Sequence, residues 1–208
     1  MLISGGIAEV LGVLLGDGCI SRYHSHNRVN LAVAFTGSNS EFGYYEDFVK
    51  PTLESWFNVK GYLYRRKDNT TRFHIFGAKL AMQLISIGIP VGRKVDAMIP
   101  SCVFESGKII DFIRGIYHAE GSIYRRYSKR YNTHVRVYDN LLSLQIRMKL
   151  RTLMHQINSE LIKLGIVTNR LTEKDGVYTL RITRQSMIQR FFEIVEPKFK
   201  TEPHPANL

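Results

Sequence analysis

The chain has 208 residues, of which 44% are hydrophobic and 23% are charged, so it can form one substantial domain or two small ones. Lysine and arginine outnumber aspartate and glutamate by 29 to 18. The resulting net charge of +11 favours a polyanionic partner, nucleic acid before an anionic membrane surface, over a merely solvated basic surface. The longest apolar run, residues 10–15, is far shorter than the roughly 20 residues of a membrane-spanning helix.

The N-terminal stretch and the two cysteines indicate where the protein is located. The N-terminal stretch MLISGGIAEV has no positively charged lead-in, so we expect no secretory signal. Cys19 and Cys102 are the only cysteines, which excludes a disulfide framework and favours a reducing environment. We therefore expect an intracellular protein of the cytoplasm, the nucleoid or an organelle, with free thiols and no membrane contact.

The first half of the chain opens with VLGVLLGDG at residues 10–18, an apolar stretch that predicts a buried helix ending at Asp17. Beyond it, alternating apolar residues predict strands and apolar residues three to four apart predict helices. The expected elements are, in chain order, a strand over 28–37, a helix over 41–57, a hairpin of strands 61–67 and 71–77, and a helix over 78–89.

The second half repeats this pattern from IRGIYHAEG, residues 113–121, which aligns with VLGVLLGDG without a gap. The alignment pairs Gly12 with Gly115, Gly16 with Ala119 and Asp17 with Glu120. The elements that follow are a strand over 141–149, a helix over 150–165, strands over 168–174 and 177–183 and a helix over 184–195.

The repeat predicts an α+β fold of two pseudo-symmetric halves, each in the order helix–strand–strand–helix–strand–strand–helix. We place the halves at residues 1–104, including most of a connector that starts at Pro90, and 105–208. Small residues four apart share one helix face and let two helix backbones approach closely. We therefore expect the two motif helices to pack together through Gly12, Gly16, Gly115 and Ala119, on a pseudo-twofold axis.

That packing would gather Asp17 and Glu120 at the C-terminal ends of both helices, where the helix dipoles are negative. Two carboxylates at such a place repel each other, and a divalent cation removes the conflict. Oxygen ligands without histidine or cysteine suit Mg²⁺, Mn²⁺ or Ca²⁺, with Mg²⁺ the first choice because it keeps waters and binds substrate phosphates. Two carboxylates, Mg²⁺ and a basic protein indicate phosphodiester hydrolysis.

Polar faces of the predicted strands indicate where nucleic acid binds. Their Arg, Gln, Asn, Ser and Thr side chains pair with base edges and phosphates, and they include few acids. The candidate DNA contacts of the strands are Arg28, Asn30, Thr36, Ser38, Tyr64, Arg66, Arg72, His74, Ser143, Gln145, Arg147, Lys149, Asn169, Thr179, Arg181 and Thr183, with Arg22 before the first predicted strand.

Residues 122–138, SIYRRYSKRYNTHVRVY, are rich in arginine, lysine and tyrosine and contain no acid. They predict a long hairpin that tracks phosphates. Its candidate contacts are Arg125, Arg126, Lys129, Arg130 and Arg136. Because the second half of the chain carries more positive charge than the first, we expect an asymmetric binding site.

VLGVLLGDG and IRGIYHAEG resemble the two motif copies of the LAGLIDADG homing endonucleases, and the order of elements extends the resemblance over nearly the whole chain. The resemblance implies a single-chain, pseudo-dimeric monomer whose two curved antiparallel sheets bind a long double-stranded DNA target. It implies metal binding by Asp17 and Glu120, with help from the carbonyl groups of Gly16 and Ala119. Mg²⁺ is the expected cofactor, Mn²⁺ can substitute, and Ca²⁺ can bind without supporting cleavage.

The family often places a basic residue near the active site after the last helix of each half. Lys94 and Lys200 occupy the corresponding positions and would stabilise charge in the transition state or position water; ordinary surface lysines are the alternative. Some members carry a glutamine after the second strand of the first half. This sequence departs from them with Thr36-Gly37-Ser38, which leaves Ser38 as a candidate for positioning water.

The function expected from these residues is site-specific, metal-dependent hydrolysis of a long asymmetric DNA target by a free-standing, intron-encoded enzyme. An RNA-binding maturase on the same fold, with its host intron RNA as partner, is one alternative. A non-cleaving DNA-binding protein is the other. Acids in both motifs favour cleavage.

Overall fold

The structure is a computed structural model that describes residues 2–25, 28–126, 129–130, 133–136 and 141–202. The chain divides into two compact units, Met1–Ala119 and Glu120–Leu208. The first unit therefore contains one sheet and both motif helices up to Ala119. The boundary expected near residue 104 refers to the sequence repeat and stays a prediction.

The first motif helix, α1 (Gly5–Asp17), forms where the sequence predicts it. The Ser4 side chain caps its start by accepting a hydrogen bond from the backbone N–H of Ile7 at 3.3 Å. Residues 7–15 are all buried, so the helix lies inside the first unit. Strand pairing begins at Gly18, whose extended backbone ends the helix immediately after Asp17.

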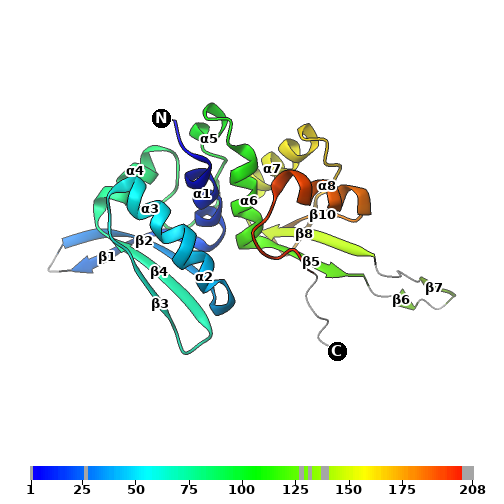
Figure 1. Cartoon of the computed structure of the whole chain (residues 1–208), viewed down its shortest axis with the longest axis horizontal. Coiled ribbons are helices and arrows are strands. Elements are labelled where there is room, and N and C mark those ends of the chain that lie inside the picture. Colours follow the sequence, from blue (N-terminus) through cyan, green and yellow to red (C-terminus); the bar gives the residue numbers. More distant parts are fainter. Residues whose placement is uncertain (1, 26–27, 127–128, 131–132, 137–140, 203–208) are drawn as a thin grey trace. The chain divides into compact units, whose positions relative to one another are not determined.

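The sheet of the first unit has the antiparallel order β1-β2-β4-β3 (Figure 1). Its strands are β1 (Gly18–Ser25), β2 (Arg28–Ser38), β3 (Tyr62–Arg65) and β4 (Thr70–Phe76). Ile20, Val33, Phe35, Phe73 and Ile75 form one fully buried face, because period-two alternation points them all the same way.

Helices cover that buried face. The predicted helix over 41–57 forms as consecutive segments: a 3₁₀ turn η1 (Asn39–Glu41), α2 (Phe42–Tyr44), a π-helical turn η2 (Tyr45–Val49) and α3 (Lys50–Phe57). Asn58 ends α3 in the left-handed conformation. Helix α4 (Ala78–Ser86) packs against β2 through Leu80, Ala81 and Leu84.

The connector after α4 is ordered by two contacts that the sequence did not indicate. Ile20 and Val91 form a parallel bridge, and the backbone N–H of Gly92 donates to the carbonyl of Ile20 at 2.8 Å. The connector then forms a short helix, α5 (Ser101–Glu105), before the second motif helix, α6 (Ile109–Glu120).

The second unit repeats the sheet of the first, in the antiparallel order β5-β8-β10-β9. Its strands are β5 (Gly121–Arg125), β8 (Leu142–Met148), β9 (Thr172–Lys174) and β10 (Val177–Ile182). Between β5 and β8, a small hairpin pairs β6 (Lys129–Arg130) with β7 (Val135–Arg136).

Two helices bury one face of this second sheet (Figure 1). They are α7 (Arg151–Lys163), which contacts β10, and α8 (Gln185–Val195), which contacts β8 and β10. The predicted strand over 168–174 is shorter than expected, because only its last three residues pair with β10. Among the described residues, no helix has the length and apolar character needed to cross a membrane.

Candidate functional site

Helices α1 and α6 touch backbone to backbone inside the first unit. A Cβ atom placed on Gly12 would lie 2.3 Å from the carbonyl oxygen of Phe112, and one placed on Gly115 would lie 1.9 Å from the carbonyl oxygen of Glu9. Real Cβ atoms do not approach other atoms so closely. Only glycine at both positions permits this helix pair.

The contacts between the two helices advance in the same direction along both. Gly5 at the start of α1 faces Asp111 near the start of α6, and Gly12 further along faces Gly115. The helices therefore run parallel within the first unit, and α1 ends at Asp17 while α6 continues through Ala119 to Glu120. Asp17, Gly16, Ala119 and Glu120 are all half-buried.

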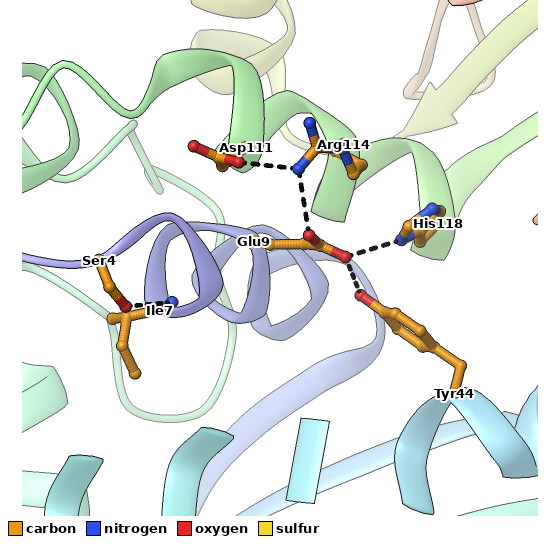
Figure 2. A network of polar contacts seen from close by, with 7 residues as sticks. All are labelled: Ser4, Ile7, Glu9, Tyr44, Asp111, Arg114 and His118. Carbon is orange, nitrogen blue, oxygen red and sulfur yellow. Dashed lines mark hydrogen bonds and ion pairs between the residues drawn. The ribbon is translucent and has the colours of Figure 1, made fainter. Parts of the chain in front are cut away.

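A buried carboxylate, that of Glu9 on α1, forms polar contacts with side chains of α6 (Figure 2). Its side chain is 2% exposed and lies 3.3 Å from Nη1 of Arg114, which also donates to Asp111 at 2.7 Å. The Tyr44 hydroxyl donates to Glu9 Oε1 at 2.8 Å, and His118 Nδ1 lies 3.3 Å from the same oxygen. Burying a carboxylate without partners would cost much free energy of desolvation. Glu9 is tolerated in the core because it has these partners.

The electrostatics of this network follow from burial. Burial raises the pKa of Tyr44 far above its ordinary value, and the charge of Glu9 raises it further, so the hydroxyl remains a donor. Burial lowers the pKa of Arg114, but Asp111 and Glu9 more than offset it and the net shift is upward. Sequence reasoning missed Glu9. The available signal was an acid in an otherwise apolar helix, with Arg114 and His118 in the second motif copy.

Asp17 lies close to the aromatic side chain of Tyr45. Burial raises the pKa of the Tyr45 hydroxyl, and the negative charges of Asp17 and Glu41 raise it further. Tyr45 is 2% exposed and its ring meets that of Phe35 edge to face at 6.3 Å. The charge of Asp17 thus acts on a buried aromatic side chain of η2.

Lys94 lies at the C-terminal end of α1. Its ammonium donates to the carbonyl oxygens of Leu15 and Gly16, each at 2.7 Å, of Gly18 at 2.9 Å and of Leu14 at 3.3 Å. The last carbonyls of a helix have no partner within it, and a cation there also opposes the negative end of the dipole. Lys94 therefore caps the helix that carries Asp17, and the Gly16 carbonyl that the resemblance assigns to metal accepts from this lysine.

Lys200 lies in the second unit, beyond α8. Its backbone is in the left-handed region, with φ of 58°, and its ammonium lies 5.6 Å from the centre of the Phe199 ring. It is half-buried.

The open face of the first sheet carries most of its predicted DNA contacts. Strand register places Asn30, Thr36, Arg72, His74 and Tyr64 on the face opposite the buried one. Strand alternation adds Arg28 and Ser38 on β2 and, in the turn after β3, Arg66 lies beside Thr70. Ser38 caps η1: its Oγ accepts from the N–H of Ser40 at 3.3 Å.

Arg22 departs from this grouping. It pairs with Leu31 and alternates with Ile20, so its exposed side chain starts from the other face of the sheet.

Burial lowers the pKa of His74, and the charge of Arg72 lowers it further, so the ring is neutral at pH 7.

The open face of the second sheet is the more polar of the two. Gln145 and Arg147 alternate along β8, Lys149 follows the end of that strand, and Arg181 pairs with Gln145. Gln145 donates to the Ser122 hydroxyl at 3.1 Å. Beside the sheet, the Thr183 hydroxyl donates to the side-chain carbonyl of Asn169 at 3.1 Å.

Two residues expected on this DNA-contacting face are buried. Ser143 is 1% exposed and Thr179 is 7% exposed. Arg125 is exposed, but it alternates with Ile123 and so starts from the helix-covered side of the sheet. Arg126 follows β5, and its N–H donates to the carbonyl of Leu141 at 2.8 Å.

The basic hairpin forms in part. Lys129 pairs with Arg136, and Arg130 with Val135, which makes the hairpin of β6 and β7. The side chains of Lys129, Arg130 and Arg136 lie outside the described residues.

Within the described part of the chain, no three His, Cys, Asp or Glu residues form a cluster that could hold a metal.

Comparison with known proteins supports the resemblance. Residues 108–196 match the family model of the LAGLIDADG-like domain. The chain is 22% identical to I-DmoI in complex with DNA and Mn, with a TM-score of 0.61 over 95% of this chain and 97% of that one. It is 13% identical to the LAGLIDADG meganuclease I-AabMI bound to uncleaved DNA, with a TM-score of 0.60 over 95% and 85% of the two chains.

A K262A mutant of I-SmaMI gives a TM-score of 0.65 at 11% identity, over 94% of this chain and 86% of that one. The resemblance to the single-chain LAGLIDADG homing endonucleases is thereby confirmed, as is the α+β fold of two halves with four-stranded antiparallel sheets.

Proposed function

We propose that this chain is a site-specific, metal-dependent endonuclease that hydrolyses phosphodiesters in a long, asymmetric double-stranded DNA target. The observation that carries the proposal is the parallel pair of α1 and α6, in contact through Gly12 and Gly115, with an acid as the last residue of each helix. Each acid leads directly into a four-stranded sheet with basic and polar residues on its open face.

Asp17 and Glu120 would hold the metal. Carboxylate oxygens without histidine or cysteine suit Mg²⁺, and the absence of a three-residue cluster among the described residues suits an ion that keeps its waters. Such an ion, when bound, supplies an activated water and neutralises charge on the phosphate. I-DmoI has been obtained in complex with DNA and Mn and with DNA and Ca, which supports Mn²⁺ as a substitute and Ca²⁺ as a ligand.

The chain's own residues would position the metal ligands and the attacking water, and would stabilise negative charge on the reacting phosphate. Lys94 holds the last turn of α1 through three of its carbonyls and that of Gly18, and so fixes the backbone that carries Asp17. Lys200 would stabilise negative charge on the phosphate in the transition state. The Gly16 and Ala119 carbonyls would assist the two carboxylates in binding the metal. Ser38 would position water.

Each of the two sheets would bind one half of the target. The protein would act as a monomer with internal pseudo-twofold symmetry. Phosphate contacts from arginine and lysine would fix the register, and polar side chains on the strands would read bases. An intron-encoded, intracellular enzyme fits this activity, with its host intron RNA as a further partner.

The test is selection of cleaved sites from a random duplex library with Mg²⁺, followed by two variants. Asp17→Asn and Glu120→Gln should abolish cleavage and leave DNA binding largely intact. Glu46→Gln and Asp47→Asn, which neutralise exposed acids on η2, serve as matched controls and should cleave normally. Binding and folding lost together in both acid variants would refute the metal assignment, and RNA binding with no cleaved site would favour the maturase.

A further inference from the structure

A row of aromatic rings crosses the open face of the first sheet. We call Tyr23, Tyr62, Tyr64, His74 and Phe76 the aromatic strip. The ring of Phe76 lies 5.7 Å from that of Tyr23, 5.7 Å from that of His74 and 6.0 Å from that of Tyr62, and the His74 ring lies 5.9 Å from that of Tyr64. The strip therefore runs continuously over β1, β4 and β3.

Three of the five rings of the strip are exposed. Tyr62 is 57% exposed, Phe76 53% and Tyr64 45%. Core packing does not account for them, because the opposite face of the same strands supplies the core with Val33 and Phe73. Neighbouring aromatic side chains that are exposed together on a protein surface are typical of a binding site.

The chemistry of the strip selects what it can bind. Cys19, Ala32 and Ala34 lie beside it in register, so the centre of this face offers methyl groups, a thiol and ring edges. None of these forms the paired hydrogen bonds that identify guanine or cytosine. Apolar side chains in the major groove instead contact the C5-methyl group of thymine. Asn30 and Arg72, on either side of the centre, can make polar contacts.

The second sheet shows the contrast within one chain. At the corresponding place its open face pairs Gln145 with Ser122 and Arg181, and Thr179 with Arg147. Arginine and glutamine make bidentate hydrogen bonds to guanine and adenine. The two open faces therefore differ in the kind of contact that they can make with bases.

We infer that the first unit recognises an A·T-rich half-site through thymine methyl groups packed on the aromatic strip, whereas the second unit reads its half-site by hydrogen bonds. The inference rests on the proposed binding of duplex DNA, but not on cleavage. The positive charge of the chain and the basic residues Arg28, Arg66 and Arg72 around the strip suit a duplex with its phosphates.

The experiment begins with selection of bound duplexes by the full chain with Ca²⁺, so that binding is scored without cleavage. One half of the selected site should be enriched in A·T pairs. Replacing its thymines by deoxyuridine removes only the methyl groups and keeps every hydrogen bond. Affinity should fall about fourfold for each methyl group that the strip covers. The same replacement in the other half-site should change affinity little.

Variants assign the effect to the strip. Tyr62→Ser and Phe76→Ser should weaken binding to the thymine target and make it indistinguishable from the deoxyuridine target. Trp56→Ser and Met82→Ser, which remove exposed apolar side chains from α3 and α4, are matched controls and should keep the discrimination. Phe76→Leu retains apolar volume, separates loss of contact from loss of folding, and should keep part of the discrimination.

Three results would overturn the inference. Deoxyuridine could leave affinity unchanged, it could act equally in both half-sites, or Phe76→Ser could retain full discrimination. A protein that selects no duplex but binds single-stranded RNA through the same rings would also overturn it, since stacked unpaired bases are the other ligand that exposed aromatic rings accept. Incubating the selected duplex with Mg²⁺ tests cleavage separately, so the proposed function can fail while this inference stands.

Discussion

Substitution of Gly115 by alanine tests the helix pair on which the candidate site depends. Two effects oppose each other. Alanine has a higher helix propensity than glycine, which alone would stabilise α6 by about 1 kcal/mol. The new Cβ atom, however, would lie 1.9 Å from the carbonyl oxygen of Glu9 and 3.0 Å from the backbone nitrogen of Val13.

Steric repulsion should outweigh the gain in helix propensity, because both neighbours of the new Cβ are backbone atoms of a helix and cannot rotate away. Restoring ordinary contact requires α1 and α6 to separate by roughly 1.5 Å, which would also stretch the 3.3 Å pair of Glu9 and Arg114. Overpacking of this kind costs about 1–3 kcal/mol or more. We expect a net loss of about 2 kcal/mol and a melting temperature lower by roughly 4–8 °C.

The assay is thermal unfolding followed by circular dichroism, with Gly6→Ala as the matched control. Gly6 lies in α1, but its Cβ would meet only side-chain atoms at ordinary van der Waals distance, those of Thr52 from 3.5 Å and of Phe48 at 3.9 Å. That variant should be stabilised by about 0.5–1 kcal/mol, since only the propensity gain remains. A Gly115→Ala protein as stable as Gly6→Ala would refute the close backbone contact.

Three further predictions concern the network, the helix cap and a titrating ring. Glu9→Ala should lower the free energy of unfolding in urea by about 1–3 kcal/mol, because the Tyr44 hydroxyl loses its acceptor and the half-buried Arg114 loses one of its two carboxylates, and Glu9→Gln, which keeps an acceptor for Tyr44, should lose less. Lys94→Met keeps the side-chain length but leaves helix carbonyls without a donor, so it should destabilise by about 1–3 kcal/mol and also slow cleavage; unchanged stability would make Lys94 a purely catalytic group. His74 should titrate below 6.5 in an NMR experiment, and Arg72→Ala should raise that pKa. Because the folded pKa is depressed, the contribution of His74 to stability is present above pH 6.5 and is lost as pH falls below it.

The sequence predicts much of the fold because the repeat is expressed in local patterns. Period-two alternation identified β2, β4, β8 and β10, and the acid-glycine pair after each apolar stretch identified the ends of α1 and α6. The π-helical turn over Tyr45–Val49 and the helix α5 were not predicted, since nothing in their residues distinguishes them from an ordinary helix or a connector.

What the sequence by itself determined is the repeat and the residues that we propose to carry chemistry: two acids in matched motifs, small residues at helical spacing, and basic strand faces. Tertiary structure alone decided how they are used. It paired the carboxylate of Glu9 with Arg114 and Tyr44, it brought Lys94 from the connector to the last carbonyls of α1, and it joined aromatic residues from three strands into one strip. The physical reason is that periodicity specifies a side chain's face within its own element. Its partners come from elements distant in sequence, and the register and crossing of those elements depend on packing across the whole unit.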